Sequence, residues 1–314
     1  MSRSSKRSGS AQRISPISVI SAIALSLVST FAAADYGLNF PKPVTAIAQE
    51  VYGLHMLIMM VCVGIGIVVF GAMFWSIVMH RKSRGAKAAK FHESTTIEII
   101  WTAIPFVILV GMAIPSTATL IKMEDTKNAD LVIKVTGYQW KWKYEYLDQD
   151  ISFFSSMSTP RDQIDNKAAK GKDYLLEVDN AIVIPTGKKV RFLVTANDVI
   201  HAWWVPQLAV KKDAIPGFIN ETWTRVDEPG IYRGQCAELC GKDHGFMPIV
   251  VQAVSAEDFT RWVSMQKDKA AAESAGGAKT WSKDELIERG KKVYASTCAA
   301  CHGVNGEGMG PFPK

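Results

Sequence analysis

Twelve residues, Cys236-Ala-Glu-Leu-Cys240-Gly-Lys-Asp-His244-Gly-Phe-Met247, bring two thiols, an imidazole and a thioether together in one short segment. Soft sulfur ligands combined with imidazole select copper, or zinc and iron–sulfur clusters in other geometries. A mononuclear blue-copper loop needs one cysteine, one histidine and a weak methionine ligand, with a second histidine upstream. Two cysteines four residues apart can bridge two metal ions, each completed by one histidine and one weaker ligand.

A second imidazole is available upstream, in Asp198-Val-Ile-His201-Ala-Trp-Trp. On its own, His201 would be explained more simply as a buried histidine. Beside a loop that lacks one imidazole, it becomes a candidate ligand. The alternative for Cys236 and Cys240 is a disulfide in an oxidising compartment, but a disulfide would leave His244 and Met247 unexplained.

The sequence around this loop has a pattern typical of an all-β domain. Turn signals such as Pro185-Thr-Gly187 and Pro229-Gly230 separate short runs rich in β-branched and aromatic residues. Many short strands with such turns favour a sandwich or barrel. The runs predicted as strands are Leu131–Tyr146, Tyr174–Asp179, Val190–Thr195, Ile231–Gln235 and Pro248–Val254.

Two apolar segments precede the β-rich region, Leu54–Met79 and Ile97–Leu120. Each is long enough to cross a hydrocarbon core of roughly 30 Å. The loop between them carries five basic residues against Glu93, which predicts a cytoplasmic loop and a hairpin with both ends outside. The basic residues of the loop are Arg81, Lys82, Arg84, Lys87 and Lys90.

The overall composition agrees with a membrane protein, since 48% of the 314 residues are hydrophobic. We attribute the net charge of +6 to membrane topology and find no nucleic-acid-binding signature. At the N-terminus, a basic segment, an apolar run from Ile17 to Phe31 and the small residues 32–34 predict a cleaved export signal.

The C-terminal segment contains a second cofactor motif. A short amphipathic helix is expected over Ala256–Lys269, followed by an Ala- and Gly-rich linker. Ser282 and Glu285 form a potential capping box. The helix that follows leads into Cys298-Ala-Ala-Cys301-His302, which matches the attachment signature of c-type haem.

The haem motif is followed by little sequence, because the chain given ends at Lys314. About 34 residues are fewer than an unsupported core needs, so the expectation is either a truncated sequence or a remnant domain. Ordering such a tail costs more than its few apolar side chains return. We therefore expect the tail from Trp281 to be disordered or loosely helical.

From about Pro43 to Val263 the chain resembles subunit II of cytochrome c oxidase. The resemblance rests on the two apolar spans, Gly137-Tyr-Gln-Trp140-Lys-Trp142, residues 198–204, Lys212-Asp-Ala-Ile-Pro-Gly217 and the cysteine loop. It implies a cupredoxin β-barrel that holds the binuclear CuA centre. Cys236 and Cys240 would bridge both coppers, His201 and His244 would each give one nitrogen, and Met247 and the Glu238 carbonyl would be weak ligands.

The same resemblance implies roles outside the copper ligands. Trp140 would be the electron entry point, Glu98 a proton-uptake entrance, and the Glu238 carboxylate a ligand of magnesium shared with subunit I. A haem c on Cys298, Cys301 and His302 would belong to a fused cytochrome c domain. Lys141 and Phe218 depart from the mitochondrial pattern, in which an aromatic residue and an arginine are usual, so docking of the donor could differ.

Together these inferences predict the electron-entry subunit of a proton-translocating cytochrome c oxidase in the cell inner membrane, with its C-terminal domain in the periplasm. Its partners would be subunits I and III, a cytochrome c and membrane lipid. A copper-free subunit of a quinol oxidase, or a free periplasmic copper or haem carrier, fits less well with the complete ligand set and the hairpin. The predicted segments are a signal peptide (1–34), a transmembrane hairpin (35–125), a CuA domain (126–269), a linker (270–280) and an incomplete cytochrome c domain (281–314).

Overall fold

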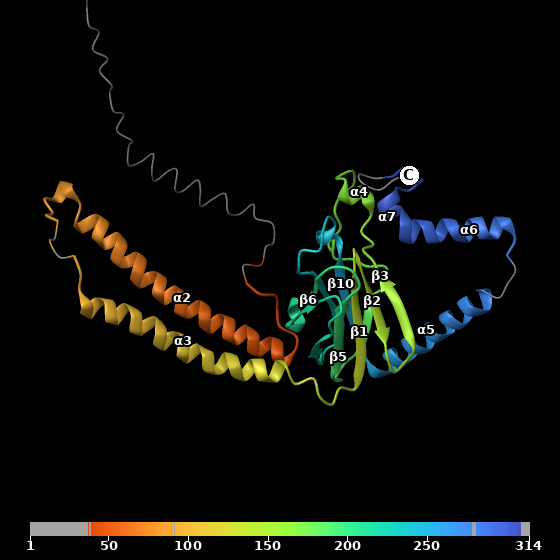
Figure 1. The fold of residues 1–314 in the computed structure, drawn as a ribbon, viewed down its shortest axis with the longest axis horizontal. Helices are drawn as coiled ribbons and strands as arrows, with labels where there is room; N and C mark the ends of the chain where they lie inside the picture. The colour runs from red at the N-terminus through yellow and green to blue at the C-terminus, as the bar shows by residue number, and fades with distance from the viewer. Residues whose placement is uncertain (1–36, 38, 89, 91, 278–280, 309–314) are drawn as a thin grey trace, which may run out of the picture.

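The computed structural model describes residues 37, 39–88, 90, 92–277 and 281–308 (Figure 1). The chain forms a helical hairpin, a β-domain and a C-terminal helical segment, in that order. The predicted export signal, residues 1–34, lies outside the described residues.

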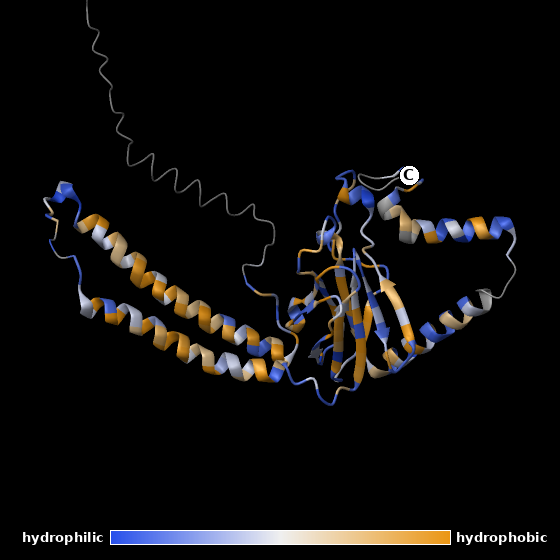
Figure 2. Cartoon of the chain, viewed as in Figure 1, coloured by the Kyte–Doolittle hydropathy of each residue, from blue (hydrophilic) through white to orange (hydrophobic). Residues whose placement is uncertain are grey.

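The hairpin consists of α2 (Ala46–Met79) and α3 (Thr95–Met123), which confirms the two predicted apolar helices. Both are long and apolar enough to cross a membrane, and Figure 2 shows their hydrophobic surfaces. The helix α2 begins well before the apolar run because the Thr45 side chain accepts a hydrogen bond from the Ala48 N–H at 3.0 Å. Near the β-domain, Lys122 of α3 and Glu50 of α2 form an ion pair at 2.8 Å. The connecting loop contains a short 3-10 turn, η2 (Lys82–Arg84).

The β-domain is a sandwich of two five-stranded sheets, ordered β3-β2-β1-β5-β8 and β4-β10-β9-β6-β7. The pairs β1–β5 and β4–β10 are parallel and the other pairs are antiparallel. Alternating residues point into a core that includes Trp142, Phe192, Trp203 and Ile249. The bounds are β1 Leu131–Tyr138, β2 Lys141–Tyr146, β3 Ile151–Ser155, β4 Ile182–Pro185, β5 Val190–Ala196, β6 His201–Val205, β7 Val210–Ala214, β8 Asn220–Thr224, β9 Gly230–Cys236 and β10 Pro248–Val254.

The sequence located some strands correctly and missed others. The predicted run Leu131–Tyr146 is two strands, because the chain turns at Gln139 and Trp140. The strand predicted at Tyr174–Asp179 is wrong. Arg233 holds this segment in turns by bonding the Leu176 carbonyl at 2.5 Å and the Asp173 carboxylate at 2.9 Å. The missed strands β3, β4, β6, β7 and β8 have four or five residues each, which is too short for a clear alternation.

Short helical segments interrupt the connections between strands. They are α4 (Arg161–Ile164) and the 3-10 turns η3 (Pro206–Leu208) and η4 (His244–Phe246). Two of them border sites described below: α4 contributes Arg161 to a cavity, and η4 carries His244.

After the sandwich, α5 (Ala256–Gly277) continues through residues predicted as linker. Its first turns are held by Phe259 and Trp262, whose ring centroids lie 6.4 and 5.0 Å from that of Tyr146. The segment 270–277 remains helical because it is rich in alanine, the strongest helix former. The helix was predicted to end at Lys269, but it continues to Gly277.

The C-terminal segment contains α6 (Lys283–Val293), a π-helical turn η5 (Tyr294–Cys298) and α7 (Ala299–His302). The predicted capping box of Ser282 and Glu285 is present, with bonds of 3.3 and 2.9 Å. Although α6 buries no residue, residues 283–302 are helical, so of the two expected states, disordered or loosely helical, the disordered one is wrong for these residues. Local capping, and acidic and basic residues at the appropriate helix ends, stabilise α6 without a core.

Candidate metal centre

The metal-binding side chains come from the ends of β6 and β9 and from the loop before β10. His201 is the first residue of β6, and Cys236 is the last residue of β9. The antiparallel pairing of these strands sets Trp203 opposite Cys236 and so brings His201 close to it. Cys240 and His244 follow in the loop, and Met247 immediately precedes β10.

The donor atoms form a compact group. The Cys236 and Cys240 Sγ atoms are 3.8 Å apart, the His201 Nδ1 lies 3.9 Å from Cys236 Sγ, and the His244 Nδ1 lies 3.4 Å from Cys240 Sγ. The Glu238 carbonyl oxygen lies 3.4 Å from Cys236 Sγ. His201, Cys236 and Cys240 are buried and offer donor atoms that all lie within 4.8 Å of one another.

The donors suit a soft metal. Both thiols are free, so the disulfide alternative is not realised. Met247, with an exposed fraction of 1%, is buried beside them in the core. Two thiols, each with an imidazole nitrogen within 3.9 Å, match the preference of copper for thiolate and imidazole.

The two thiols differ in acidity before a metal binds. Burial opposes ionisation of both. At Cys236 burial is the largest single effect, but the hydrogen bonds with His201, with the backbone of Glu238 and Ala202 and with His244 together outweigh it and lower the pKa to about 7. At Cys240, burial and the adjacent Cys236 thiolate raise the pKa to about 12. Cys236 is therefore the more acidic of the two thiols, and a bound metal would favour the thiolate form of both.

Asp198 and Gly137 fix the orientation of the His201 ring. The Asp198 Oδ1 lies 2.9 Å from His201 Nε2, which leaves Nδ1 directed at the thiols. Burial raises the pKa of the Asp198 carboxyl, but hydrogen bonds from His201 and from the backbone of Gln139 and Val199 lower it overall. A Cβ atom at Gly137 would lie 2.7 Å from the His201 Cδ2, so this position must be glycine for the ring to fit.

Trp140 and Gln139 hold the cysteine loop against the turn between β1 and β2. The indole Nε1 of Trp140 and the amide Nε2 of Gln139 donate to the Cys240 carbonyl at 3.1 and 2.9 Å. Trp140 is half-buried, so its indole connects the metal loop with the surface.

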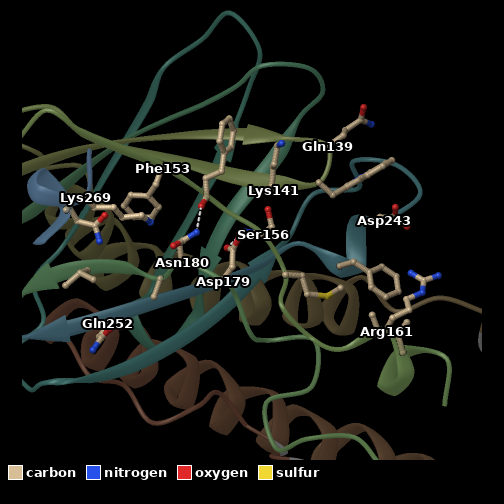
Figure 3. A pocket seen from close by; sticks show the side chains of 18 of the residues that line it. Gln139, Lys141, Phe153, Ser156, Arg161, Asp179, Asn180, Asp243, Gln252 and Lys269 are labelled. Carbon is tan, nitrogen blue, oxygen red and sulfur yellow. Dashed lines mark hydrogen bonds between the residues drawn. The ribbon is translucent and has the colours of Figure 1, made fainter. Parts of the chain in front are cut away.

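A cavity of about 720 Å³ opens beside Trp140, and Figure 3 shows its lining. It is bounded by β2, β3, α4, α5 and the cysteine loop. Four of its lining residues are basic and two are acidic, so the excess of charge is positive. These six residues are Lys141, Arg161, Lys242, Lys269, Asp179 and Asp243.

The other residues that the sequence singled out lie apart from the donor group. The Glu238 side chain is exposed, although its carbonyl faces Cys236. Glu98 lies in the first turn of α3, where its Oε1 accepts the Ser94 N–H at 3.3 Å. Cys298 ends η5, while Cys301 and His302 belong to α7.

Sequence reasoning did not identify Asp198, Gly137 or Gln139 as supports of the centre. Asp198 could have been found, because it stands three residues before a histidine proposed as a ligand. Gly137 contacts His201 and Gln139 contacts Cys240, and each pair is separated by more than sixty residues of sequence. No local sequence pattern reveals such contacts.

This geometry defines a class of protein: a membrane-anchored β-sandwich with a buried sulfur–imidazole centre. The sequence matches the family of the cytochrome c oxidase subunit II periplasmic domain over residues 131–254, and that of its transmembrane domain over residues 33–119. Residues 287–314 match the cytochrome c family.

Two individual relatives belong to the same family, and one solved structure is similar over part of the chain. The probable cytochrome c oxidase subunit 2 of Rickettsia bellii is 44% identical over 259 residues, covering 81% of this chain and 94% of that protein. Cytochrome c oxidase subunit 2 of Cyanidium caldarium is 39% identical over 237 residues, covering 74% and 91%. The crystal structure of the periplasmic domain of oxidase subunit II from Bradyrhizobium japonicum is 45% identical, with a TM-score of 0.42, and covers 46% of this chain and 98% of that chain.

The chain therefore belongs to the cytochrome c oxidase subunit II family. As such it is part of a haem–copper oxidase, and its family implies copper in the β-domain and association with subunit I. The cytochrome c match covers the predicted haem motif.

Replacing Asp198 with asparagine should weaken copper binding by about 10- to 100-fold, because the His201 ring loses the carboxylate that orients it. The measurement is copper retained by the purified full chain against a competing chelator. Asp148→Asn, an exposed carboxylate in the turn after β2, is the matched control. Unchanged copper affinity in Asp198→Asn would contradict the role assigned to this contact.

Proposed function

We propose that this chain accepts electrons from a cytochrome c and passes them through a CuA centre to the haem of subunit I, for reduction of oxygen to water coupled to proton translocation. The observation that carries the proposal is the buried group of His201, Cys236 and Cys240, with the half-buried His244 imidazole 3.4 Å from the Cys240 Sγ. Copper held by these residues would supply a site that gains and loses an electron with little rearrangement of its ligands.

The chain's own residues would supply that site. Cys236 and Cys240 would hold the metals through their thiolates, and His201 and His244 each present Nδ1 toward one thiol. Met247 and the Glu238 carbonyl complete the set as weak ligands. The exposed Glu238 carboxylate is left free to reach a magnesium ion at the boundary with subunit I.

Trp140 is the proposed point of electron entry. Its indole bonds the carbonyl of a copper ligand on one side and lines the surface cavity on the other. The positive excess of that cavity suits a donor with an acidic face, since complementary charge speeds and orients docking. Lys141, where mitochondrial relatives usually have an aromatic residue, contributes to this charge.

Glu98 is the proposed entrance for protons. It is the only acidic residue of α3, and it stands in the first turn of a helix suited to span a membrane. Ionisable groups in such segments are costly and usually functional. Its exposed side chain could exchange protons with the cytoplasmic solvent and with subunit I.

The C-terminal helices are proposed to belong to a fused cytochrome c unit. Cys298 and Cys301 would hold the haem by thioether bonds, and His302 would be its proximal ligand. The helical turn that contains them is fastened by the Tyr294 hydroxyl, which donates to the Gly303 carbonyl at 2.8 Å. This unit would follow the CuA domain in the segment 281–314, and the helical stretch of α5 would separate the two.

Metal analysis of the assembled oxidase tests these assignments together. The subunit should carry two coppers with a mixed-valence EPR spectrum, and iron should match the haems of subunit I plus one covalent haem. Glu238→Gln should lose magnesium and keep both coppers, because the ligand at this position is the carbonyl. One copper with a blue mononuclear spectrum would rule out the CuA assignment.

A paired experiment separates electron entry from proton uptake. Trp140→Phe should slow copper reduction by cytochrome c at least about tenfold, equivalent to roughly 1.4 kcal/mol of barrier, with the copper spectrum unchanged because Gln139 still holds the loop. Glu98→Gln should leave copper reduction fast and slow oxygen turnover. Each variant is the control for the other, and loss of the copper spectrum in either would show a structural role instead.

The proposed topology places the loop with Arg81 and Lys82 in the cytoplasm and the β-domain in the periplasm of an inner membrane. A reporter enzyme fused after Arg84 should be active only in the cytoplasm, and one fused after Asp150 only in the periplasm. The reverse pattern would overturn the orientation, which depends on the excess of positive charge in this loop.

A further inference from the structure

A long connection between two strands forms one wall of the cavity beside Trp140. Residues 156–181 join β3 to β4 and make the longest link between successive strands of the sandwich. We call this segment the β3–β4 arm. It contains only one turn of helix, α4, which lies beyond the ends of the strands in Figure 1. Long connections with so little secondary structure are usually functional.

Several contacts fix the base of the β3–β4 arm. Met157 and Val178 form a β-bridge between its two ends. Arg233 of β9 donates to the Leu176 carbonyl at 2.5 Å and to the Asp173 carboxylate at 2.9 Å. The arm is therefore held beside the cavity by the chain itself. A docking partner would meet a preformed wall, which lowers the ordering cost of binding.

The acidic residues of the cavity already have partners within the chain. The Asp179 Oδ1 accepts the Ser156 N–H at 2.7 Å, and the Asp243 Oδ2 lies 4.0 Å from the Lys242 Nζ. Both carboxylates belong to residues that line the cavity. Their negative charge is therefore partly offset before any partner arrives.

Three basic residues of the same cavity keep donors available. Among the described residues, neither Lys141 nor Lys269 forms an ion pair. The Lys141 Nζ lies 4.5 Å from the centroid of the Phe154 ring, a cation–π contact that holds the ammonium group at the cavity. Arg161, the first residue of α4, pairs with Asp165 through Nε at 3.4 Å, so within the described chain its terminal nitrogens remain available. Figure 3 shows the three cations on different sides of the cavity.

Aromatic side chains contribute apolar surface to the same lining. Trp140, Phe153, Phe246 and Trp262 all line the cavity. The cavity thus combines available positive charge with an apolar surface that includes the proposed electron entry point. A partner surface with carboxylates around an apolar contact would complement this arrangement.

The occupant that fits is a separate acidic protein. The described C-terminal residues 281–308 carry four basic and four acidic side chains, so they offer no net negative charge to the cavity. Lys141, Arg161 and Lys269 come from three different elements, β2, α4 and α5, and surround the cavity instead of converging on one point. This spread suits several carboxylates on a protein surface better than one small anion.

We propose that the β3–β4 arm, together with Lys141 and Lys269, recognises an acidic electron-donor protein and orients it toward Trp140. Carboxylates around the donor's redox centre bind Arg161, Lys141 and Lys269, and the charge at these positions determines which donor is accepted. The inference rests on the proposed electron entry at Trp140, and it names the class of partner and the residues that select it.

Stopped-flow reduction of the assembled oxidase tests this selection with one donor in two charge states. The donor is a basic mitochondrial-type cytochrome c, used either native or with its surface lysines succinylated, which reverses its net charge. The succinylated form should reduce the copper at least about tenfold faster at low ionic strength, because complementary charge accelerates association. This advantage should shrink as the salt concentration approaches about 150 mM, because salt screens exposed charges.

Charge-reversal variants test the individual residues. Arg161→Glu and Lys269→Glu should each slow the succinylated donor about tenfold and speed up the native one, whereas a damaged copper site would slow both. Arg225→Glu is the matched control. The Arg225 side chain is 58% exposed and paired with an aspartate, as the Arg161 side chain is at 56%, but Arg225 does not line the cavity.

The outcomes separate this proposal from that of electron entry. Equal or reversed rates for the two donor forms, or an unchanged preference in both variants, would overturn the selection by charge. If Trp140→Phe still slowed both forms in that case, electron entry would stand. If neither form reduced the copper, both proposals would fail. ATP at millimolar concentration should inhibit no more than sodium chloride of equal ionic strength, and stronger inhibition would identify a small-anion site instead of a protein-docking site.

Discussion

The pairing of β6 with β9 is the contact on which the metal centre depends. It sets two residues separated by 35 positions, His201 and Cys236, at the same end of the sheet. The approach of these strands is so close that a Cβ atom at Gly234 would lie 1.9 Å from the Trp204 carbonyl oxygen. Only glycine allows this spacing, so a residue that is not itself a ligand, two positions before Cys236, helps to determine whether the two halves of the site meet.

Burial then gives the site its rigidity. The ligands lie at the edge of a core that includes Trp142 and Trp203, and the Trp142 ring meets the His201 ring edge-on with centroids 5.9 Å apart. Asp198 fixes the other side of the imidazole, and the turn at Gln139 and Trp140 fixes the loop. A centre held from three directions changes little in geometry when its charge changes, which suits electron transfer.

The chain is also modular, and each module is stabilised differently. The hairpin depends on a membrane or partner to cover its apolar surface, which is exposed in the isolated chain. The β-domain has its own core, and the C-terminal helices rely on capping and local contacts. The junction of hairpin and β-domain is held by polar contacts, among them those of Lys212 with Glu124 and of Thr126 with Glu221.

The sequence by itself determined the features that local patterns encode. These features are the apolar runs long enough to cross a membrane, the basic residues between them, the spacing of cysteine and histidine, and the capping box at Ser282. Each depends on residues that are close together in the sequence. The tertiary structure decided what depends on contacts between distant segments. It folded the segment 174–179 into turns through its contacts with Arg233, and it directed the His201 Nδ1 at the thiols through Asp198. These outcomes follow from packing geometry, which one-dimensional spacing does not contain.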